Sequence, residues 1–239
     1  MSIEAPVALV TGASRGLGQA MSLALASRGW RLGLVARDQQ RLEICAEAVR
    51  RQGGEAWVFS ADLGQPAEAH KLAEQLTARY GQRLDLLVNN AGNMGDERRF
   101  EAVNPGFWSA LLEANLTSAY LCCWYLLPAL KEARGCIVNI SSGAAVRTGF
   151  LNLAYGVAKA GLDRLTQGLA AELNGTVACV SLSPPVSDTE TVRKIYPTQA
   201  VTEWAAPPSL TADALLKLLD LGPSRFNGQV VGARELLEQ

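Results

Sequence analysis

Several residue types that carry chemistry are scarce in this sequence. The only histidine, His70, has no companion at metal-ligand spacing, so we expect no metal site and place His70 on a helix surface. Aromatic residues make up only 6% of the chain. The cysteines are odd in number and lack CxxC spacing, which predicts free, buried thiols in a reducing cytoplasm rather than disulfides. They are Cys45, Cys122, Cys123, Cys136 and Cys179.

Long apolar runs and an excess of one charge are also missing. No stretch of about 18 uncharged apolar residues is present, so a membrane span is not expected. The net charge is −1 and no basic stripe occurs, which argues against a nucleic-acid partner. The N-terminus "MSIEAPVALV" carries an acid and no basic segment, so it does not resemble a secretory signal. We therefore expect a cytoplasmic protein.

Apolar runs of strand length alternate with stretches of helical length. The chain has 239 residues, 49% of them hydrophobic, which is enough for one domain with a full core. Predicted strands cover residues 7–12, 31–36, 56–61, 84–90, 136–141, 177–183 and 228–233. Predicted helices cover residues 17–28, 38–52, 66–80, 105–133 and 153–173.

This alternation predicts the α/β class. The fold is expected to be a single Rossmann-type, doubly wound domain over residues 1–239, with a central parallel sheet of about seven strands and helices on both faces. The pairs Pro184–Pro185 and Pro207–Pro208 are interpreted as loops rather than a domain boundary.

The stretch "TGASRGLG", residues 11–18, follows the first predicted strand and opens the first predicted helix. Glycine allows a tight turn and a close approach of phosphate to the backbone, and the helix start presents N–H groups to an anion. This context favours a dinucleotide site over a merely structural turn. The spacing is T-G-x-x-x-G-x-G.

Further motifs follow in a consistent order: "ADL" at 61–63, "NNAG" at 89–92, Asn115 in "EANLTSAY", then Ser142, and Tyr155 with Lys159 in "YGVAK". Together with the glycine loop, they make the chain resemble the short-chain dehydrogenase/reductase family over residues 6 to about 232. The serine and tyrosine are 13 residues apart, as is usual there. The chain departs from the family at Pro185, which stands where a glycine is usual, so the nicotinamide-side loop must differ locally.

The residues support the implied chemistry independently. Tyr155 and Lys159 are four apart on a predicted helix and share a face, and Ser142 ends the fifth predicted strand. The resemblance implies that Tyr155 is the acid/base and that Ser142 orients the substrate oxygen. Lys159 would hold the nicotinamide ribose and lower the tyrosine pKa, and Asn115 would support a water relay. Ser141 competes with Ser142 for this position, Asn115 may equally be a plain helix residue, and Tyr155 with Lys159 may be a surface pair.

Two arginines suggest which coenzyme is bound. Arg15 lies within the glycine loop, and Arg37 follows the second strand, where an NAD enzyme usually has an acid and this chain has Ala36. Both could clasp a 2′-phosphate, so we expect NADP(H); two solvated arginines are the alternative. Asp38 is interpreted as a helix cap. Asp62 is expected to meet the adenine, or else to cap the next helix.

The expected cofactor contacts are Gly12, Ser14, Arg15, Gly16, Leu17, Gly18, Arg37, Asp62, Leu63, Asn90, Ala91, Gly92, Tyr155, Lys159, Pro184, Val186 and Thr189. Asn89 is expected to be structural. The substrate wall is expected to comprise Met94, Ala144, Val146, Phe150 and a mobile flap at about 187–204, with Tyr196 and Trp204 favouring an apolar or aromatic carbonyl compound.

The sequence thus predicts an NADP(H)-dependent oxidoreductase that acts on a carbonyl or secondary alcohol. The alternatives are a non-catalytic, NADP(H)-binding redox sensor on the same fold, or a related epimerase or dehydratase. The apolar helix at 107–130 and the small residues Gly156, Ala158 and Gly161 predict a homodimer or homotetramer.

Overall fold

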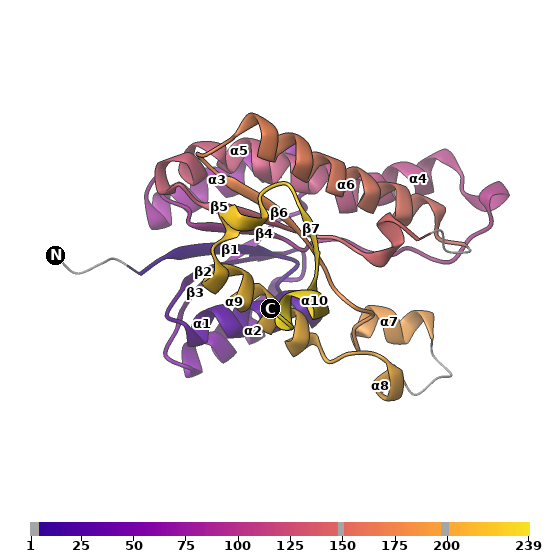
Figure 1. Cartoon of the computed structure of the whole chain (residues 1–239), viewed down its shortest axis with the longest axis horizontal. Coiled ribbons are helices and arrows are strands. Elements are labelled where there is room, and N and C mark those ends of the chain that lie inside the picture. Colours follow the sequence, from indigo (N-terminus) through magenta and orange to yellow (C-terminus); the bar gives the residue numbers. More distant parts are fainter. Residues whose placement is uncertain (1–4, 148–150, 197–200) are drawn as a thin grey trace.

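Seven parallel strands form one sheet in the order β3-β2-β1-β4-β5-β6-β7 (Figure 1). The structure, a computed structural model, describes residues 5–147, 151–196 and 201–239. The strands are β1 Val7–Thr11, β2 Arg31–Ala36, β3 Glu55–Ser60, β4 Leu86–Asn89, β5 Cys136–Ile140, β6 Ala178–Ser183 and β7 Val230–Gly232. The strand order reverses between β1 and β4, and a sheet of this kind binds ligands at the carboxyl ends of the strands at that point.

Helices cover both faces of the sheet, as the sequence predicts. One face carries α1 (Gly16–Ser27), α2 (Gln39–Arg51), α9 (Pro208–Leu221) and α10 (Ala233–Leu237); the other carries α3 (Pro66–Tyr80), α5 (Ser118–Ala133) and α6 (Leu153–Glu172) (Figure 1). Alternate residues of β1 divide between the two cores. Val10 is buried with Leu25 of α1 in one core, and Leu9 is buried with Leu72 of α3 in the other. This alternation confirms the doubly wound α/β fold.

The helix predicted over residues 105–133 is interrupted, so the prediction of one continuous helix was wrong. The structure has α4 (Pro105–Leu112), then a π-helical turn over Glu113–Thr117, then α5. Asn115 lies in this turn and is 1% exposed. Single π turns often occur at functional sites, because the extra residue redirects a side chain.

The C-terminal part holds elements that the sequence did not indicate. Pro208 is the first residue of α9 rather than a loop residue, which fits the preference of proline for the first helical position. Two short helices, α7 (Glu190–Ile195) and α8 (Val201–Trp204), extend beyond the carboxyl edge of the sheet (Figure 1). The remaining short turns of helix are 3₁₀ segments at Phe100–Ala102, Gly143–Ala145 and Pro223–Phe226.

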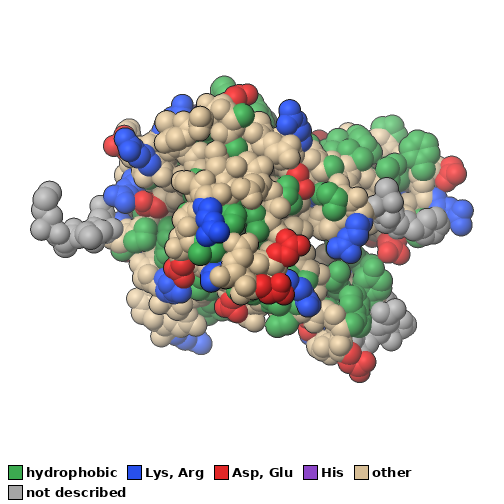
Figure 2. All heavy atoms as spheres, viewed as in Figure 1, with side chains coloured by type: hydrophobic (Ala, Val, Ile, Leu, Met, Phe, Trp, Pro, Cys, Tyr) green, Lys and Arg blue, Asp and Glu red, His purple; other side chains and the backbone are tan. Residues whose placement is uncertain are grey.

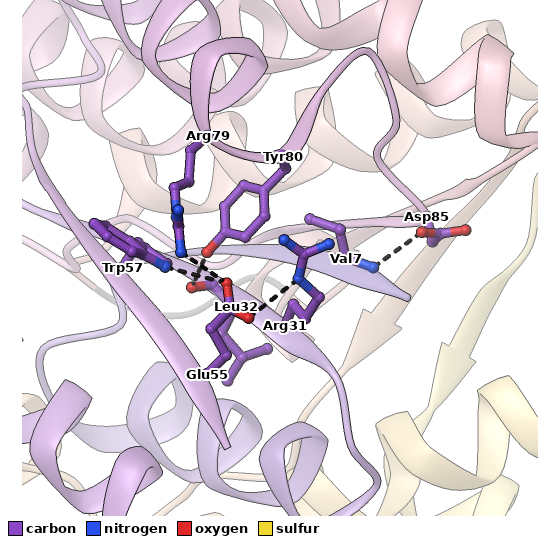
Figure 3. Close-up of polar contacts among 8 residues, drawn as sticks. All are labelled: Val7, Arg31, Leu32, Glu55, Trp57, Arg79, Tyr80 and Asp85. Carbon is purple, nitrogen blue, oxygen red and sulfur yellow. Dashed lines mark hydrogen bonds and ion pairs between the residues drawn. The ribbon is translucent and has the colours of Figure 1, made fainter. Parts of the chain in front are cut away.

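The amino edge of the sheet is held by a cluster of polar and aromatic side chains around Glu55 (Figure 3). The Glu55 carboxylate pairs with Arg31 at 3.3 Å and with Arg79 at 3.2 Å. The Arg79 guanidinium carbon lies 3.3 Å from the centroid of the Trp57 ring. The Tyr80 hydroxyl donates to the Leu32 carbonyl at 2.7 Å. Because these contacts are at the end opposite to the ligand-binding edge, we assign them to stability.

Charges of both signs are interspersed over the face drawn in Figure 2, and hydrophobic side chains gather toward the end that carries α4, α7 and α8. All five cysteines are free and buried, as expected. His70 is exposed on α3 with its ring 5.1 Å from that of Tyr125. Across the described part of the chain, every helix is too short or too polar to traverse a bilayer. The cytoplasmic location stays a prediction.

Candidate active site and cofactor site

The glycine loop leaves β1 through a turn that side chains would obstruct. Gly12 has a φ of +65°, a value that L side chains rarely adopt. A β-carbon at Gly18 would meet the Gly12 carbonyl oxygen and the Asn90 amide nitrogen. Asn90 Nδ2 donates to the Thr11 carbonyl at 2.9 Å and to the Gly12 carbonyl at 3.2 Å. Backbone is thus laid bare at the start of α1, as phosphate binding requires.

Thr11 fixes this loop to the segment after β4. Its Oγ1 accepts hydrogen bonds from the backbone N–H groups of Asn90, at 3.0 Å, and Ala91, at 2.9 Å. The same hydroxyl donates to the Val88 carbonyl at 3.3 Å. The two segments that flank the switch point therefore form one hydrogen-bonded unit.

Asn115 holds the next residues of that segment rather than lying free on a helix. Its Nδ2 donates to the carbonyls of Asn93, at 2.8 Å, and Leu111, at 2.9 Å, and its Oδ1 accepts from Asn93 N–H at 3.2 Å. A β-carbon at Gly92 would collide with this Oδ1. The π-helical turn thus carries a side chain that orders the loop, so the plain-helix alternative is wrong.

Ser142, Tyr155 and Lys159 converge from β5 and α6. The Tyr155 hydroxyl and the Ser142 hydroxyl are hydrogen-bonded to each other. Lys159 Nζ donates to the Ile140 carbonyl at 2.8 Å and lies 5.8 Å from the centroid of the Tyr155 ring. Tyr155 and Lys159 are 8% and 4% exposed, so they are not a surface pair.

Burial determines the proton affinities of this group. Burial raises the pKa of Tyr155, and the hydrogen bond with Ser142 opposes that shift. Burial also lowers the pKa of Lys159 to about 8, against the opposing charge of Asp163. The expected lowering of the tyrosine pKa by Lys159 is therefore not found in the protein without cofactor, because desolvation outweighs the neighbouring cation.

The structure distinguishes the alternatives for two other residues. Ser141 is 2% exposed and its hydroxyl has no partner among the described residues, whereas Ser142 faces Tyr155. Asp62 does not cap α3, whose N-cap residue is Gln65. Asp62 Oδ1 instead accepts from Gly64 N–H at 3.2 Å, in the turn before that helix.

A cavity of about 960 Å³ joins these groups along the carboxyl edge. That volume is in the range of small-molecule and cofactor sites. The predicted site residues that line it are Gly12, Ser14, Arg15, Gly16, Leu17, Arg37, Asp62, Leu63, Asn90, Ala91, Gly92, Asn115, Ser142, Tyr155, Lys159, Pro184, Val186 and Thr189. Gly18 is the exception: it is buried behind the loop and acts through packing.

Parts of the expected substrate wall are also found there. Met94, Ala144 and Tyr196 line the cavity, whereas Val146 is 80% exposed and does not. The ring of Trp204 makes an edge-to-face contact with Tyr196, at 5.4 Å between centroids. Phe150 lies outside the described residues. Flap movement stays a prediction, and residues 197–200 of that segment are also outside the described part.

Pro185 is accommodated by a loop with its own backbone support. The Ser187 hydroxyl donates to the Pro185 carbonyl at 2.9 Å. Ala206 N–H donates to the Val186 carbonyl at 2.9 Å, and Ser187 and Ala206 form an isolated parallel bridge. The segment after β6 is thus anchored without a glycine.

The cationic end of the cavity contains one residue more than the sequence predicts. Arg37 and Arg41 line it together with Arg15. Asp38 is the N-cap of α2, as expected, and accepts from Arg41 N–H at 3.0 Å. Arg41 could have been found from the sequence, because a residue three positions after a helix cap lies on the same turn.

The comparisons with known proteins agree with this geometry. The family model for short chain dehydrogenase matches residues 6–200. The chain belongs to the short-chain dehydrogenase family. A short-chain dehydrogenase relative, the rhamnolipids biosynthesis 3-oxoacyl-[acyl-carrier-protein] reductase of Pseudomonas aeruginosa, is 35% identical over 192 residues, which are 77% of this chain and 73% of that protein.

Two solved structures of short-chain dehydrogenases are also similar. The Pseudomonas aeruginosa RhlG/NADP active-site complex has a TM-score of 0.88 and 29% identity, and the match covers 95% of this chain and 94% of the other. The alcohol dehydrogenase of Thermococcus sibiricus complexed with 5-hydroxy-NADP has a TM-score of 0.87 and 28% identity, with 96% of each chain covered. The chain is therefore an oxidoreductase of alcohol or carbonyl substrates that uses a nicotinamide cofactor.

Proposed function

We propose that this short-chain dehydrogenase transfers a hydride between NADP(H) and a carbonyl or secondary alcohol, with Tyr155 as the acid/base. One observation carries the proposal. The hydrogen-bonded pair of Ser142 and Tyr155 lies with Lys159 in the same cavity as the bare glycine loop. Carbonyl reduction needs a proton donor and an oxygen-orienting donor beside a bound dinucleotide, and this cavity offers both.

The residues divide the work as follows. Ser142 orients the substrate oxygen, and Tyr155 donates a proton to it as negative charge develops. Lys159, held by the Ile140 carbonyl, binds the ribose hydroxyls and supplies a cation behind the tyrosine. Asn115 acts as a positioning residue through its bonds to Asn93. The bound nicotinamide supplies or accepts the hydride.

The preference for NADP(H) rests on charge at the adenosine end. Arg15 and Arg37 line the cavity, and Ala36 at the end of β2 leaves no carboxylate for a 2′-hydroxyl. Hydrogen bonds between ionised groups are stronger than neutral ones, and arginine matches phosphate geometry. The NADP complexes of the two similar structures support this choice.

The substrate is proposed to be a carbonyl or alcohol compound with an apolar or aromatic part. Met94, Ala144 and Tyr196 line the region of the cavity beside Ser142. Their side chains offer apolar contact and one phenol, rather than a charge that would select an ionic substrate.

Fluorescence titration with NADPH and NADH tests the cofactor assignment. We expect NADPH to bind at least about tenfold tighter, because two charge-assisted contacts are added. The double variant Arg15→Ala, Arg37→Ala should lose most of this preference and still bind NADH. Equal dissociation constants for the two coenzymes in the wild-type protein contradict the assignment.

Turnover is tested by a screen of ketones and aldehydes that follows the loss of NADPH absorbance. Reduction of members of one chemical class supports the enzyme. Tight NADPH binding without turnover of any carbonyl or alcohol, in either direction, favours the redox-sensor alternative.

A further inference from the structure

A carboxylate from α7 occupies the cations of the adenosine end. Glu190 accepts from Lys194 Nζ at 2.9 Å, from Arg41 at 2.7 Å and from Arg15 at 2.9 Å. We call these four residues the Glu190 cluster. Its members come from the glycine loop, α2 and α7, and 149 sequence positions separate Arg41 from Glu190.

The cluster lies within the cavity rather than on a remote surface. All four of its residues line the cavity, together with Arg37 and Asp38. The start of α7 is also close to the glycine loop, since a β-carbon at Gly16 would lie 3.2 Å from the Thr189 methyl group. Glu190 therefore meets Arg15 and Arg41 at the mouth of the proposed 2′-phosphate site.

The charge state of Glu190 suits this position. Hydrogen bonds from Lys194, Arg41 and Arg15 lower its pKa to about 2, so it is ionised at every pH of interest. Of the groups around it, Arg15, Arg37, Arg41 and Lys194 are cations, and Asp38 pairs with Arg41 at 3.4 Å. Carboxylates and phosphate esters engage guanidinium groups through the same paired N–H donors.

We propose that Glu190 is an internal competitor of the 2′-phosphate and that Arg41 is a further residue of the 2′-phosphate site. This inference rests on the proposed NADP(H) function. On binding of NADP(H), Arg15 and Arg41 exchange the Glu190 carboxylate for the phosphate, and Lys194 keeps Glu190 paired. A coenzyme without the 2′-phosphate leaves the cluster intact. Glu190 thus reduces the affinity for NADP(H) and leaves that for NAD(H) unchanged.

Calorimetric titration with 2′,5′-ADP and 5′-AMP isolates this effect, because the two probes differ by the 2′-phosphate alone. Glu190→Gln removes the charge and keeps the shape. We expect it to strengthen 2′,5′-ADP binding about three- to tenfold, as two exposed ion pairs no longer compete, and to leave 5′-AMP binding unchanged within about twofold. Arg41→Ala should weaken 2′,5′-ADP binding and shrink the effect of Glu190→Gln in the double variant.

The matched control is Glu203→Gln, which removes the same charge from an exposed position on α8. It should alter neither affinity, which excludes a general change in the field. Unchanged or weaker 2′,5′-ADP binding by Glu190→Gln overturns the inference. So does an equal change for both probes, and weaker 5′-AMP binding would make Glu190 a ligand of the ribose hydroxyls instead.

A readout without ligand tests the cluster itself. Amide hydrogen exchange in α7 should be faster in Glu190→Gln than in the wild-type protein or in Glu203→Gln, because two contacts to other elements are lost. Unchanged exchange contradicts a role of the cluster in holding α7. The two levels are distinguishable: no preference of the wild-type protein for 2′,5′-ADP overturns the NADP(H) assignment, whereas a preference insensitive to Glu190→Gln overturns only the inference.

Discussion

At the scale of single residues, the proposed chemistry depends on the Tyr155 hydroxyl. We expect Tyr155→Phe to lower kcat by about 10²–10⁴-fold, because the proton is donated only as charge develops on the substrate oxygen. The affinity for NADPH should stay nearly unchanged. Steady-state kinetics and coenzyme titration of the same preparation measure both. A variant that keeps more than about a tenth of the rate shows that another residue is the acid.

Lys159 is expected to make the free energy of unfolding depend on pH. Its pKa is lowered from 10.5 to about 8 by burial. Between these values the unfolded chain binds more protons at this site than the folded chain, so the stability of the wild-type protein rises with pH. Relative to Lys159→Met, the wild-type protein should gain up to roughly 3 kcal/mol from pH 7 to pH 10.

Urea unfolding of both proteins at several pH values gives this difference, since all other titrating groups cancel. The Asp163 carboxylate opposes the shift of Lys159. Asp163→Asn should therefore move the window toward lower pH. A difference that does not vary with pH would mean that Lys159 titrates as in water.

Single residues also show where sequence reasoning ends. Ser142, Tyr155 and Lys159 are identified by spacing along one strand and one helix, and the structure brings them together. Glu190 has no local signal, because its partners Arg15 and Arg41 are distant in sequence and meet it only in the folded chain. The raised pKa of Tyr155 was likewise not foreseen, since burial depends on packing.

At the scale of elements, the start of α1 is expected to tolerate no added methyl group. Gly18→Ala should destabilise the protein by about 1–3 kcal/mol and weaken coenzyme binding, because the methyl would displace the Gly12 carbonyl and Asn90. The control is Gly168→Ala in α6, where nothing lies within 4 Å of the added carbon. That change should stabilise by about 0.5–1 kcal/mol, as measured by thermal unfolding. Equal effects of the two changes would contradict the packing described for the loop.

The elements themselves were largely predictable. The predicted strands lie within two residues of the observed ones at each end, because buried parallel strands are continuous apolar runs. The π-helical turn was not predictable, since apolar spacing continues through it and its cause is the contact of Asn115 with Asn93. The proline pair at 207–208 was misassigned because proline is equally at home in a loop and at the first position of a helix.

At the scale of the whole molecule, an exposed aromatic surface supports the predicted homo-oligomer. Tyr120 and Trp124 on α5 are 46% and 62% exposed, and their rings are stacked at 6.3 Å. Exposed apolar patches of this kind mark association surfaces. We expect light scattering to give a dimer or tetramer for the wild-type protein and a smaller species for Trp124→Glu.

Ile44→Glu is the matched control for that experiment. Ile44 is 59% exposed on α2, across the sheet from α5. The substitution should leave the assembly unchanged. A wild-type mass near 25.5 kDa at micromolar concentration would show that the protein is a monomer.

The five buried thiols have a practical consequence for spectroscopy. Burial raises the pKa of each of them, to about 11 for Cys45 and about 12 for Cys179, so little thiolate is available to maleimide reagents at neutral pH. A cysteine introduced at the exposed Glu203 would then accept a fluorophore alone. The labelled protein would report the movement of α8 during coenzyme binding without any need to replace a native cysteine.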